Sequence, residues 1–427
     1  MFTARGCKIG CLGGVVALVA VIVFFVRWWT APIDIPRPQR PPDPADNAYE
    51  VYRSLAAYTA QMFRTDSWLA YAERELFPSR REVRTDQSEL SRYLLQKMSP
   101  IRQEYRRYLH KPCVVIAEYS LAWQFPELAE FRRWASVEAL DIAIATQEGD
   151  CARAMDDYRS LLLLAEQIRY QGLLLHYITG TTMQDIVTQQ MSIALPYLPA
   201  GACDRLVRVV REWSQKHVPL VQILPSERGL FLSVLHDLYA RKFASRRALM
   251  DYGMAIRWDP RWLNLCQAAH EGEAYFRQIE QEWQKPVIHQ RRVPQPRHRI
   301  ATLLLPELSV LPRRTAYTEA RIRLLACSAA VRAYRLRHGT YPSTLQEADA
   351  ADLARDPFTG KQFVYKATKQ GFLLYSVGED GRDDGGWRAS ERAGMNARGD
   401  VTLVPYLGKP LGVRGYADDK GEPVWFR

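Results

Sequence analysis

Between residues 47 and 283 the apolar positions recur at spacings of three and four, the period of an amphipathic helix rather than of a strand. Segment 204–217 shows this spacing at Leu206, Val209, Val210 and Trp213. Prolines and glycines interrupt the pattern, and each marks a predicted helix end: Pro78, Pro100, Pro112, Pro126, Gly149, Gly172, Pro196, Pro199, Pro225 and Pro260. The pattern therefore predicts about eight helices that fold as antiparallel pairs.

One predicted pair has a sharper signature. The second helix follows a Gly149–Asp150 turn in the stretch EGDCARAMDDYRSLLLLAEQI, and segment 134–147 is its partner. Gly149 permits a sharp reversal, and Ala154 lets the two helices approach closely. This turn and helix resemble those of a tetratricopeptide repeat. Because no second copy lies one period away in either direction, a helical hairpin within a bundle and a peptide-binding solenoid both stay open.

An uncharged apolar run of 18 residues, 9–26, lies near the N-terminus. As a helix it would rise about 27 Å, close to the thickness of the hydrocarbon core of a bilayer. Arg27, Trp28 and Trp29 follow it, and such residues anchor helix ends at a membrane surface. A cleaved signal peptide is the alternative, but the run is long for one and no A-x-A-like site follows. We therefore predict a single uncleaved transmembrane helix that ties the chain to the lipid bilayer.

Composition divides the rest of the chain. Six prolines between residues 30 and 46 predict a stiff, extended spacer. A basic, proline-rich stretch begins at Lys285 and reads as a linker. We predict five parts in chain order: a transmembrane anchor (1–29), a proline-rich spacer (30–46), a helical body (47–284), a linker and docking segment (285–318) and a C-terminal domain (319–427).

The C-terminal domain begins with one more helix. Its N-terminus is predicted at Thr315 or Thr318, because both residues can cap the first turn. Gly339 is predicted to end it, since glycine adopts the left-handed conformation that follows many helices. The Tyr341-Pro342 pair then forces an extended chain.

A mixed pattern follows this helix. The sequence DPFTG at 356–360 is typical of a turn. Two short apolar runs, 363–365 and 372–375, have the spacing of a β-hairpin, and 401–404 and 424–426 are further candidate strands. The predicted fold class is therefore α+β, mainly α: a single transmembrane helix, a body of helical hairpins, and a small C-terminal helix plus antiparallel sheet.

This order of elements resembles the globular head of the major pseudopilin of type II secretion. The likeness rests on the Tyr-Pro, Asp-Pro-x-x-Gly and Tyr-Ser-x-Gly-x-Asp-Gly elements of residues 341–381. It implies a structural module, with the body on the outer, periplasmic side of the cell membrane. The loop GEDGRDDGG places carboxylates among glycines, a composition that suits Ca²⁺. The equivalent pseudopilin loop binds calcium, so the resemblance implies metal ligands at Asp380, Asp383, Asp384 and Asp400.

The net charge of +11 comes mostly from scattered arginines, and no run of five like charges occurs. Such a surface suits attraction to an anionic membrane, whereas nucleic acid is not an expected partner because no aromatic-interleaved basic motif accompanies the charge. The seven cysteines include no C-x-x-C pair, which argues against zinc or redox chemistry.

No spacing in the chain is that of a metalloprotease, serine hydrolase, Walker or dinucleotide-binding motif. We predict that the eight histidines are surface or half-buried side chains, and that Asp156 and Asp157 lie on a solvated helix face. The leading hypothesis is a membrane-anchored, non-enzymatic scaffold that binds a protein partner. The alternatives are a structural component of a type II secretion or pilus apparatus, and a membrane-tethered hydrolase whose site is assembled from distant residues.

Overall fold

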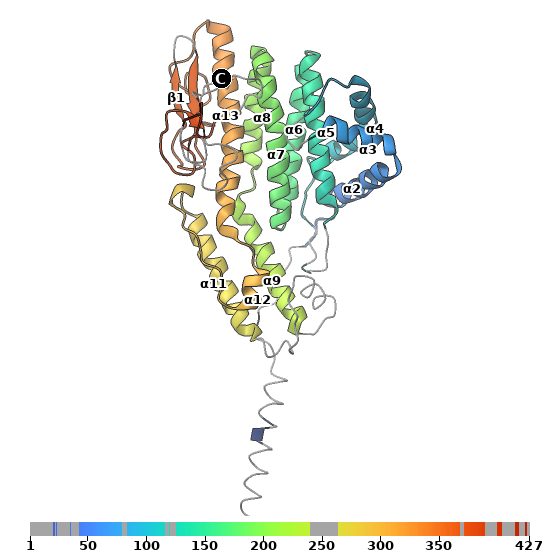
Figure 1. Cartoon of the computed structure of the whole chain (residues 1–427), viewed down its shortest axis with the longest axis vertical. Coiled ribbons are helices and arrows are strands. Elements are labelled where there is room, and N and C mark those ends of the chain that lie inside the picture. The colour runs from blue at the N-terminus through green and yellow to red at the C-terminus, as the bar shows by residue number, and fades with distance from the viewer. Residues whose placement is uncertain are drawn as a thin grey trace, which may run out of the picture.

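The computed structural model describes residues 42–78, 83–115, 119, 125–239, 264–367, 371–388, 399–403, 415–417 and 423–424, together with Ala20, Val21, Val23 and Ile35. Over these residues the chain is mainly helical, with a small antiparallel sheet of two strands near its C-terminus, as predicted. Figure 1 shows long helices side by side, with α2–α4 against one edge, the strands against the other, and a lower group of helices beneath.

Five helices form the central layer. They are α5 (Glu127–Gln147), α6 (Cys151–Arg169), α7 (Leu174–Ala194), α8 (Ala200–Lys216) and α13 (Leu311–His338). Each packs on at least two of the others, and α5 and α7 bury residues on more than one side. A helix that is buried on several faces carries apolar residues around much of its circumference. The apolar positions of α5 to α7 are therefore not confined to the single stripe of a surface helix.

Three further helices pack at the α5 edge of this layer. They are α2 (Ala48–Thr65), α3 (Ser67–Leu76) and α4 (Ser88–Arg107). Asp66 separates the first two, and its carboxylate accepts a hydrogen bond from the amide of Leu69, which caps α3.

The predicted helix break at Pro100 is wrong, because α4 runs through this residue. A proline inside a helix removes a backbone hydrogen bond and costs about 3 kcal/mol. Residues on both sides of it, Met98 and Ile101, are buried in the same core as Leu94 and Tyr105. Burying this one continuous stripe offsets the local cost.

The lower group of helices has its own core. It contains α9 (Leu224–Tyr239), α11 (Leu265–Trp283) and α12 (Arg299–Leu304). Ile35, from the predicted spacer, is buried in this core, and its carbonyl oxygen lies 3.0 Å from Nε2 of His236. At this position the spacer segment lies against the folded body.

The C-terminal helix begins earlier than predicted. α13 starts at Leu311, because Pro312 in its first turn has the backbone angle that a helix start needs. It ends at Gly339, which has φ +74°, as predicted. The helix crosses the predicted boundary between 285–318 and 319–427, and it packs on α8 and α7 within the core of the helical body.

The predicted hairpin is present. β1 (Val364–Ala367) pairs antiparallel with β2 (Phe372–Tyr375), which also contacts α13. Of the other predicted strands, Val401 forms a single bridge with Ser376. A separate sheet joins β3 (Trp387–Arg388), β4 (Gly415–Ala417) and β5 (Pro423–Val424), with β3 and β4 parallel.

The predicted transmembrane helix, 9–26, lies outside the described residues except for Ala20, Val21 and Val23, which are helical. Within the described part of the chain, no helix taken alone is both long and apolar enough to cross a bilayer. α8 and the bent continuation through α9 meet the length and composition criteria only as a pair.

The close approach of α6 and α7 can be tested at Gly180. A Cβ atom there would lie 2.7 Å from the backbone oxygen of Ala165 and 2.9 Å from the Arg169 side chain. We expect Gly180→Ala to lower the free energy of unfolding by about 1–3 kcal/mol, because neither helix can move without repacking. Gly201→Ala on α8 is the matched control, since nothing lies within 4 Å of the added carbon. Thermal unfolding in detergent measures both, and equal stability of the two variants would contradict this packing.

Candidate functional site

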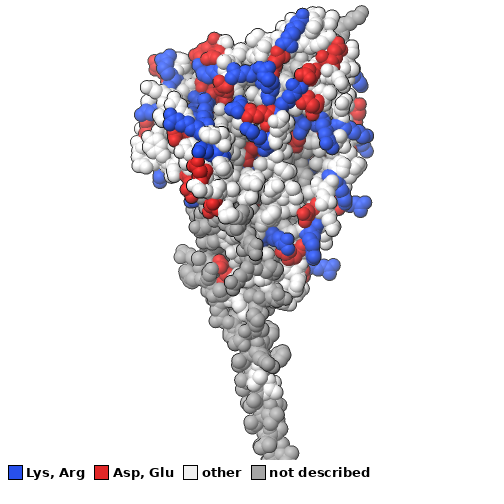
Figure 2. All heavy atoms as spheres, turned by 180° about the vertical axis from the view of Figure 1, so that it is seen from behind, with Lys and Arg blue, Asp and Glu red and all other residues white. Residues whose placement is uncertain are grey.

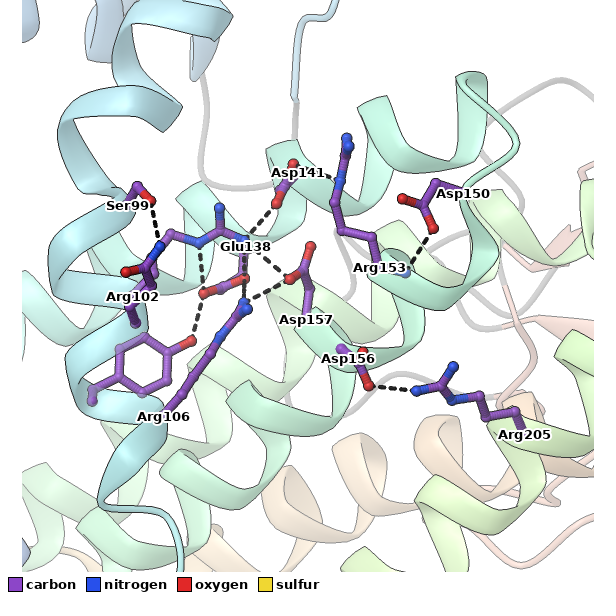
Figure 3. Close-up of polar contacts among 12 residues, drawn as sticks. Ser99, Arg102, Arg106, Glu138, Asp141, Asp150, Arg153, Asp156, Asp157 and Arg205 are labelled. Carbon is purple, nitrogen blue, oxygen red and sulfur yellow. Dashed lines mark hydrogen bonds and ion pairs between the residues drawn. The ribbon is translucent and has the colours of Figure 1, made fainter.

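A cluster of charged side chains lies between α4, α5 and α6 (Figure 3). Arg102 binds both oxygens of Glu138, with N–O distances of 2.9 and 2.7 Å. Its Nη2 also donates to Asp141 at 2.6 Å and to Asp157 at 3.0 Å. Arg106, one turn later on α4, donates to Glu138 at 2.8 Å and to Asp157 at 2.6 Å. Two arginines of one helix thus join carboxylates of two others.

Burial sets the protonation of this cluster. Glu138 and Asp157 are fully buried. Burial opposes ionisation of Glu138, but the charge and hydrogen bonds of Arg102 outweigh it and lower the pKa of the carboxyl group. For Asp157, burial and the nearby Glu138 charge prevail and raise the pKa to about 8. The neutral Asp157 can donate its proton to Asp141 in a hydrogen bond, and this bond contributes to the lowered pKa of Asp141.

This cluster can hold helices together, but it offers little to a substrate. Its central carboxylates have no exposed surface, and each arginine is already engaged by two or more of them. It lies beside the predicted α5–α6 hairpin, where Gly149 has φ +76° and Asp150 caps α6 through the amide of Arg153. The hydrogen-bonded cluster and the turn together fix three helices relative to one another.

The prediction that Asp157 lies on a solvated helix face is wrong. Asp156 is exposed and pairs with Arg205, whereas Asp157 is buried (Figure 3). Adjacent helix positions point about 100° apart, so one can face solvent and the other the core. The sequence signal for a buried acidic partner was the pair Arg102 and Arg106, because their spacing of four puts two cations on one face of a helix.

The prediction of surface or half-buried histidines fails at His176, which is fully buried. Its Nε2 lies 2.9 Å from the Tyr49 hydroxyl, which in turn donates to Glu127. Burial lowers the pKa of His176 to about 3 and keeps the ring neutral.

The four predicted calcium ligands lie near the end of β2, but they do not converge on one point. Asp383 accepts hydrogen bonds from the Tyr375 hydroxyl at 2.6 Å and from a backbone amide at 2.9 Å. Asp380 is exposed and accepts from the amide of Arg382. Asp400 is buried and accepts from the amides of Gly386 at 2.7 Å and Asp384 at 3.5 Å.

The structure therefore brings Asp384 and Asp400 close together, while Asp383 turns toward Tyr375. Burial raises the pKa of Asp400 to about 7 and also raises that of Asp384, and the charges of neighbouring carboxylates add to both shifts. Within the described residues, no group of three histidine, cysteine, aspartate or glutamate side chains is arranged to hold a metal ion. Calcium binding stays a prediction.

An aromatic pair is exposed on α3, and the sequence analysis did not single it out. The rings of Trp68 and Tyr71 stack with centroids 5.2 Å apart, and Arg74 lies 6.0 Å from the Tyr71 ring. Trp68 is 51% exposed, although a tryptophan usually buries most of its surface. The spacing 68, 71, 74 places all three side chains on one face of α3.

Charge on the rest of the surface is mixed. Figure 2 shows acidic and basic side chains interspersed over the wider end of one face. Basic charge is thus distributed over the part of this face that is described. This distribution makes the aromatic pair the more distinctive surface feature.

Comparison with protein-family models, curated proteins and solved structures gives no match for this chain.

The protonation of Asp157 can be tested by pH. A raised folded-state pKa means that Asp157 favours folding below its ordinary value of 3.8, and that this contribution is lost as the pH rises through about 8. Asp157→Asn supplies a neutral isostere, so its unfolding free energy relative to wild type should increase from pH 4 to 8. Chemical denaturation over this pH range measures the difference.

Glu138→Gln is the contrasting variant. Because Glu138 is held ionised by Arg102, its loss should destabilise the chain by about 3–5 kcal/mol at neutral pH. A difference between Asp157→Asn and wild type that stays flat with pH would contradict the protonated state of Asp157.

Calcium can be tested at the buried acid. If the loop binds Ca²⁺, about 1 mM of the ion should raise the thermal midpoint of the chain, and Asp400→Asn should remove the effect. Asp156→Asn, an exposed acid on α6, is the control. Equal midpoints with calcium and with chelator in wild type would contradict the prediction.

Proposed function

We propose that the chain is a membrane-anchored, non-enzymatic interaction protein that binds a protein partner. Residues 9–26 would span the cell membrane once, with the folded body on the outer, periplasmic side. Nucleic acid is not a proposed partner, since the basic side chains are interspersed with acidic ones. One observation carries the proposal: the exposed aromatic pair on α3.

Exposed, stacked aromatic side chains are typical of binding surfaces. Tryptophan, tyrosine and arginine are enriched at the centres of protein interfaces, because each buries a large area and loses little conformational freedom on binding. Trp68, Tyr71 and Arg74 combine these three residue types on one helix face. Their mutual contacts hold the rings in place before a partner arrives, which reduces the entropy lost on association.

A rigid support favours the same function. α3 packs on α4, and α4 is tied to α5 and α6 by the arginine–carboxylate cluster. The aromatic pair is therefore presented by a helix whose position is fixed by buried charges. A preorganised surface on rigid helices suits a scaffold that recognises one partner geometry.

The partner surface can be tested by substitution. We expect Trp68→Ala with Tyr71→Ala to reduce the recovery of cross-linked partner about tenfold or more, because truncation of central interface aromatics costs at least about 2 kcal/mol. The experiment uses the full chain in its native membrane, with chemical cross-linking and quantitative mass spectrometry. The fold should persist, because both side chains are exposed.

Tyr197→Ala provides the matched control, since Tyr197 is an exposed aromatic on η1 (Leu195–Tyr197), away from α3. It should leave the recovered proteins unchanged. If the double variant and the control recover the same proteins in the same yield, the aromatic pair is not the partner surface.

A structural component of a type II secretion or pilus apparatus is the second candidate. The antiparallel hairpin packed on α13 favours it, because a long helix bearing a small antiparallel sheet is what the pseudopilin-like resemblance implies. N-terminal sequencing of the mature chain separates the two proposals. Processing between residues 6 and 14 favours the secretion component, and an intact Met1 favours the anchored interaction protein.

A further inference from the structure

A basic segment, residues 285–304, packs on the lower group of helices. It contains no aspartate or glutamate, and its positive side chains are Lys285, Arg291, Arg292, Arg297 and Arg299. Glu282 and Glu307, which flank the segment, pair with the lysine and with one arginine. Within the described residues, no carboxylate forms an ion pair with Arg291, Arg297 or Arg299, and all three side chains are exposed. The segment therefore presents more positive than negative charge at its surface.

The segment is held on the body by buried side chains and backbone hydrogen bonds. Val293 and Ile300 are buried in the core of the lower group. The amide of Val293 donates to Oγ of Ser309 at 3.0 Å, and the amide of His298 donates to Glu271 at 2.7 Å. This part of the predicted linker therefore lies against the helices, and the arginines beside its buried positions are kept at the surface.

The end of the segment, α12, adds apolar surface next to this charge. Leu303 is 37% exposed and follows Arg299 by four positions, so the two side chains lie on one face of the helix. At the boundary of a bilayer, an apolar side chain enters the acyl region while an arginine beside it stays with the phosphates. This combination favours a lipid surface over an acidic protein as the partner of α12.

The predicted anchor would keep this segment close to the bilayer. Ile35 is buried in the same small core as Ile300 and Ala301 of α12. It follows the end of the predicted membrane run, residue 26, by nine positions, and nine residues span at most about 30 Å. This reach is close to the length of α11, whose 19 residues rise about 28 Å. The lower group, seen at the lower end of the body in Figure 1, is therefore the part that the anchor keeps nearest the membrane.

We propose that residues 285–304 dock onto anionic phospholipid headgroups of the membrane that anchors the chain, with Arg291, Arg297 and Arg299 on the phosphates and Leu303 at the boundary with the acyl chains. The inference rests on the anchor of the proposed function and adds a second contact with the same membrane. Each arginine near an anionic surface strengthens attachment about fivefold. Three such contacts fix the orientation of the body on the bilayer and hold the aromatic pair of α3 at one height above it.

Hydrogen–deuterium exchange of the full chain in lipid nanodiscs tests this contact. One set of discs contains phosphatidylcholine alone, and the other contains phosphatidylcholine mixed with phosphatidylglycerol. We expect the amides of residues 285–304 to exchange about fivefold more slowly or more in the anionic discs, because the lipid contact must open before they exchange. The difference should be lost at about 1 M salt, where the Debye length is about 3 Å.

Substitutions assign the effect to the three arginines. The triple variant Arg291→Gln, Arg297→Gln and Arg299→Gln should lose the difference between the discs, and exchange in the rest of the chain should stay unchanged because these side chains are exposed. The matched control removes three exposed arginines of α4, α8 and α13: Arg92→Gln, Arg208→Gln and Arg335→Gln. It lowers the net charge by the same amount and should keep the difference.

Three results would overturn the proposal. The first is equal exchange of residues 285–304 in neutral and anionic discs. The second is an equal loss of the difference in the triple variant and in its control, which would assign the effect to net charge alone. The third is protection of the segment in native membranes but not in anionic discs, which would assign it to an acidic protein.

Sodium carbonate extraction of native membranes separates this inference from the proposed function. A chain that stays in the membrane but shows no lipid-dependent exchange overturns only the inference. A chain that carbonate releases has no anchor, so the proposed function fails, and sedimentation of the full chain with phosphatidylglycerol vesicles then decides the inference. In that assay the triple variant should bind about 100-fold more weakly than wild type, and no binding by wild type would overturn the lipid contact.

Discussion

The desolvation of arginine charge is the constraint on which the arrangement of the helices depends. Arg102 is 8% exposed, and a guanidinium group cannot release its proton to become neutral. Its charge is met by the ionised Glu138 and Asp141 of α5, and the neutral Asp157 of α6 accepts a further hydrogen bond from it. Replacing such a cluster by apolar residues is often neutral for stability, whereas breaking it is expensive. The cluster thus specifies where α4 sits against α5 and α6.

The positions of the N-terminal helices α2 and α3 follow from that of α4. Asp66, between α2 and α3, caps α3 and also accepts a hydrogen bond from Tyr93 of α4 at 2.6 Å. The start of α2 is held separately, since the Asn47 side chain bonds both the carbonyl and the amide of Val114. α2 is therefore fastened at both ends. The aromatic pair of α3 is therefore presented by a fixed pair of helices.

The local part of this fold could be predicted from the sequence. The helical period, the Gly149 turn, the end of α13 at Gly339 and the β1–β2 hairpin each depend on a few neighbouring residues. What failed depends on distant partners. The run of α4 through Pro100 and the burial of Asp157 are decided by side chains more than thirty positions away in the sequence. The pairing of Glu127 with Tyr49, 78 positions apart, has no local signal at all.

The placement of α13 determines how the C-terminal module relates to the body. Small residues, Ala326 and Ala330 among them, are buried along α13, and they let α8 approach closely. Arg321 is 3% exposed and pairs with Asp185 of α7, so a buried ion pair also joins α13 to the helical body. The hairpin contacts this same helix through β2. Because α13 packs on the hairpin and on α7 and α8 within one continuous core, the hairpin and its acidic loop cannot reorient without disturbing α7 and α8. The acidic loop is therefore rigidly joined to the helical body. A ligand that binds the loop would for this reason raise the thermal midpoint of the whole chain.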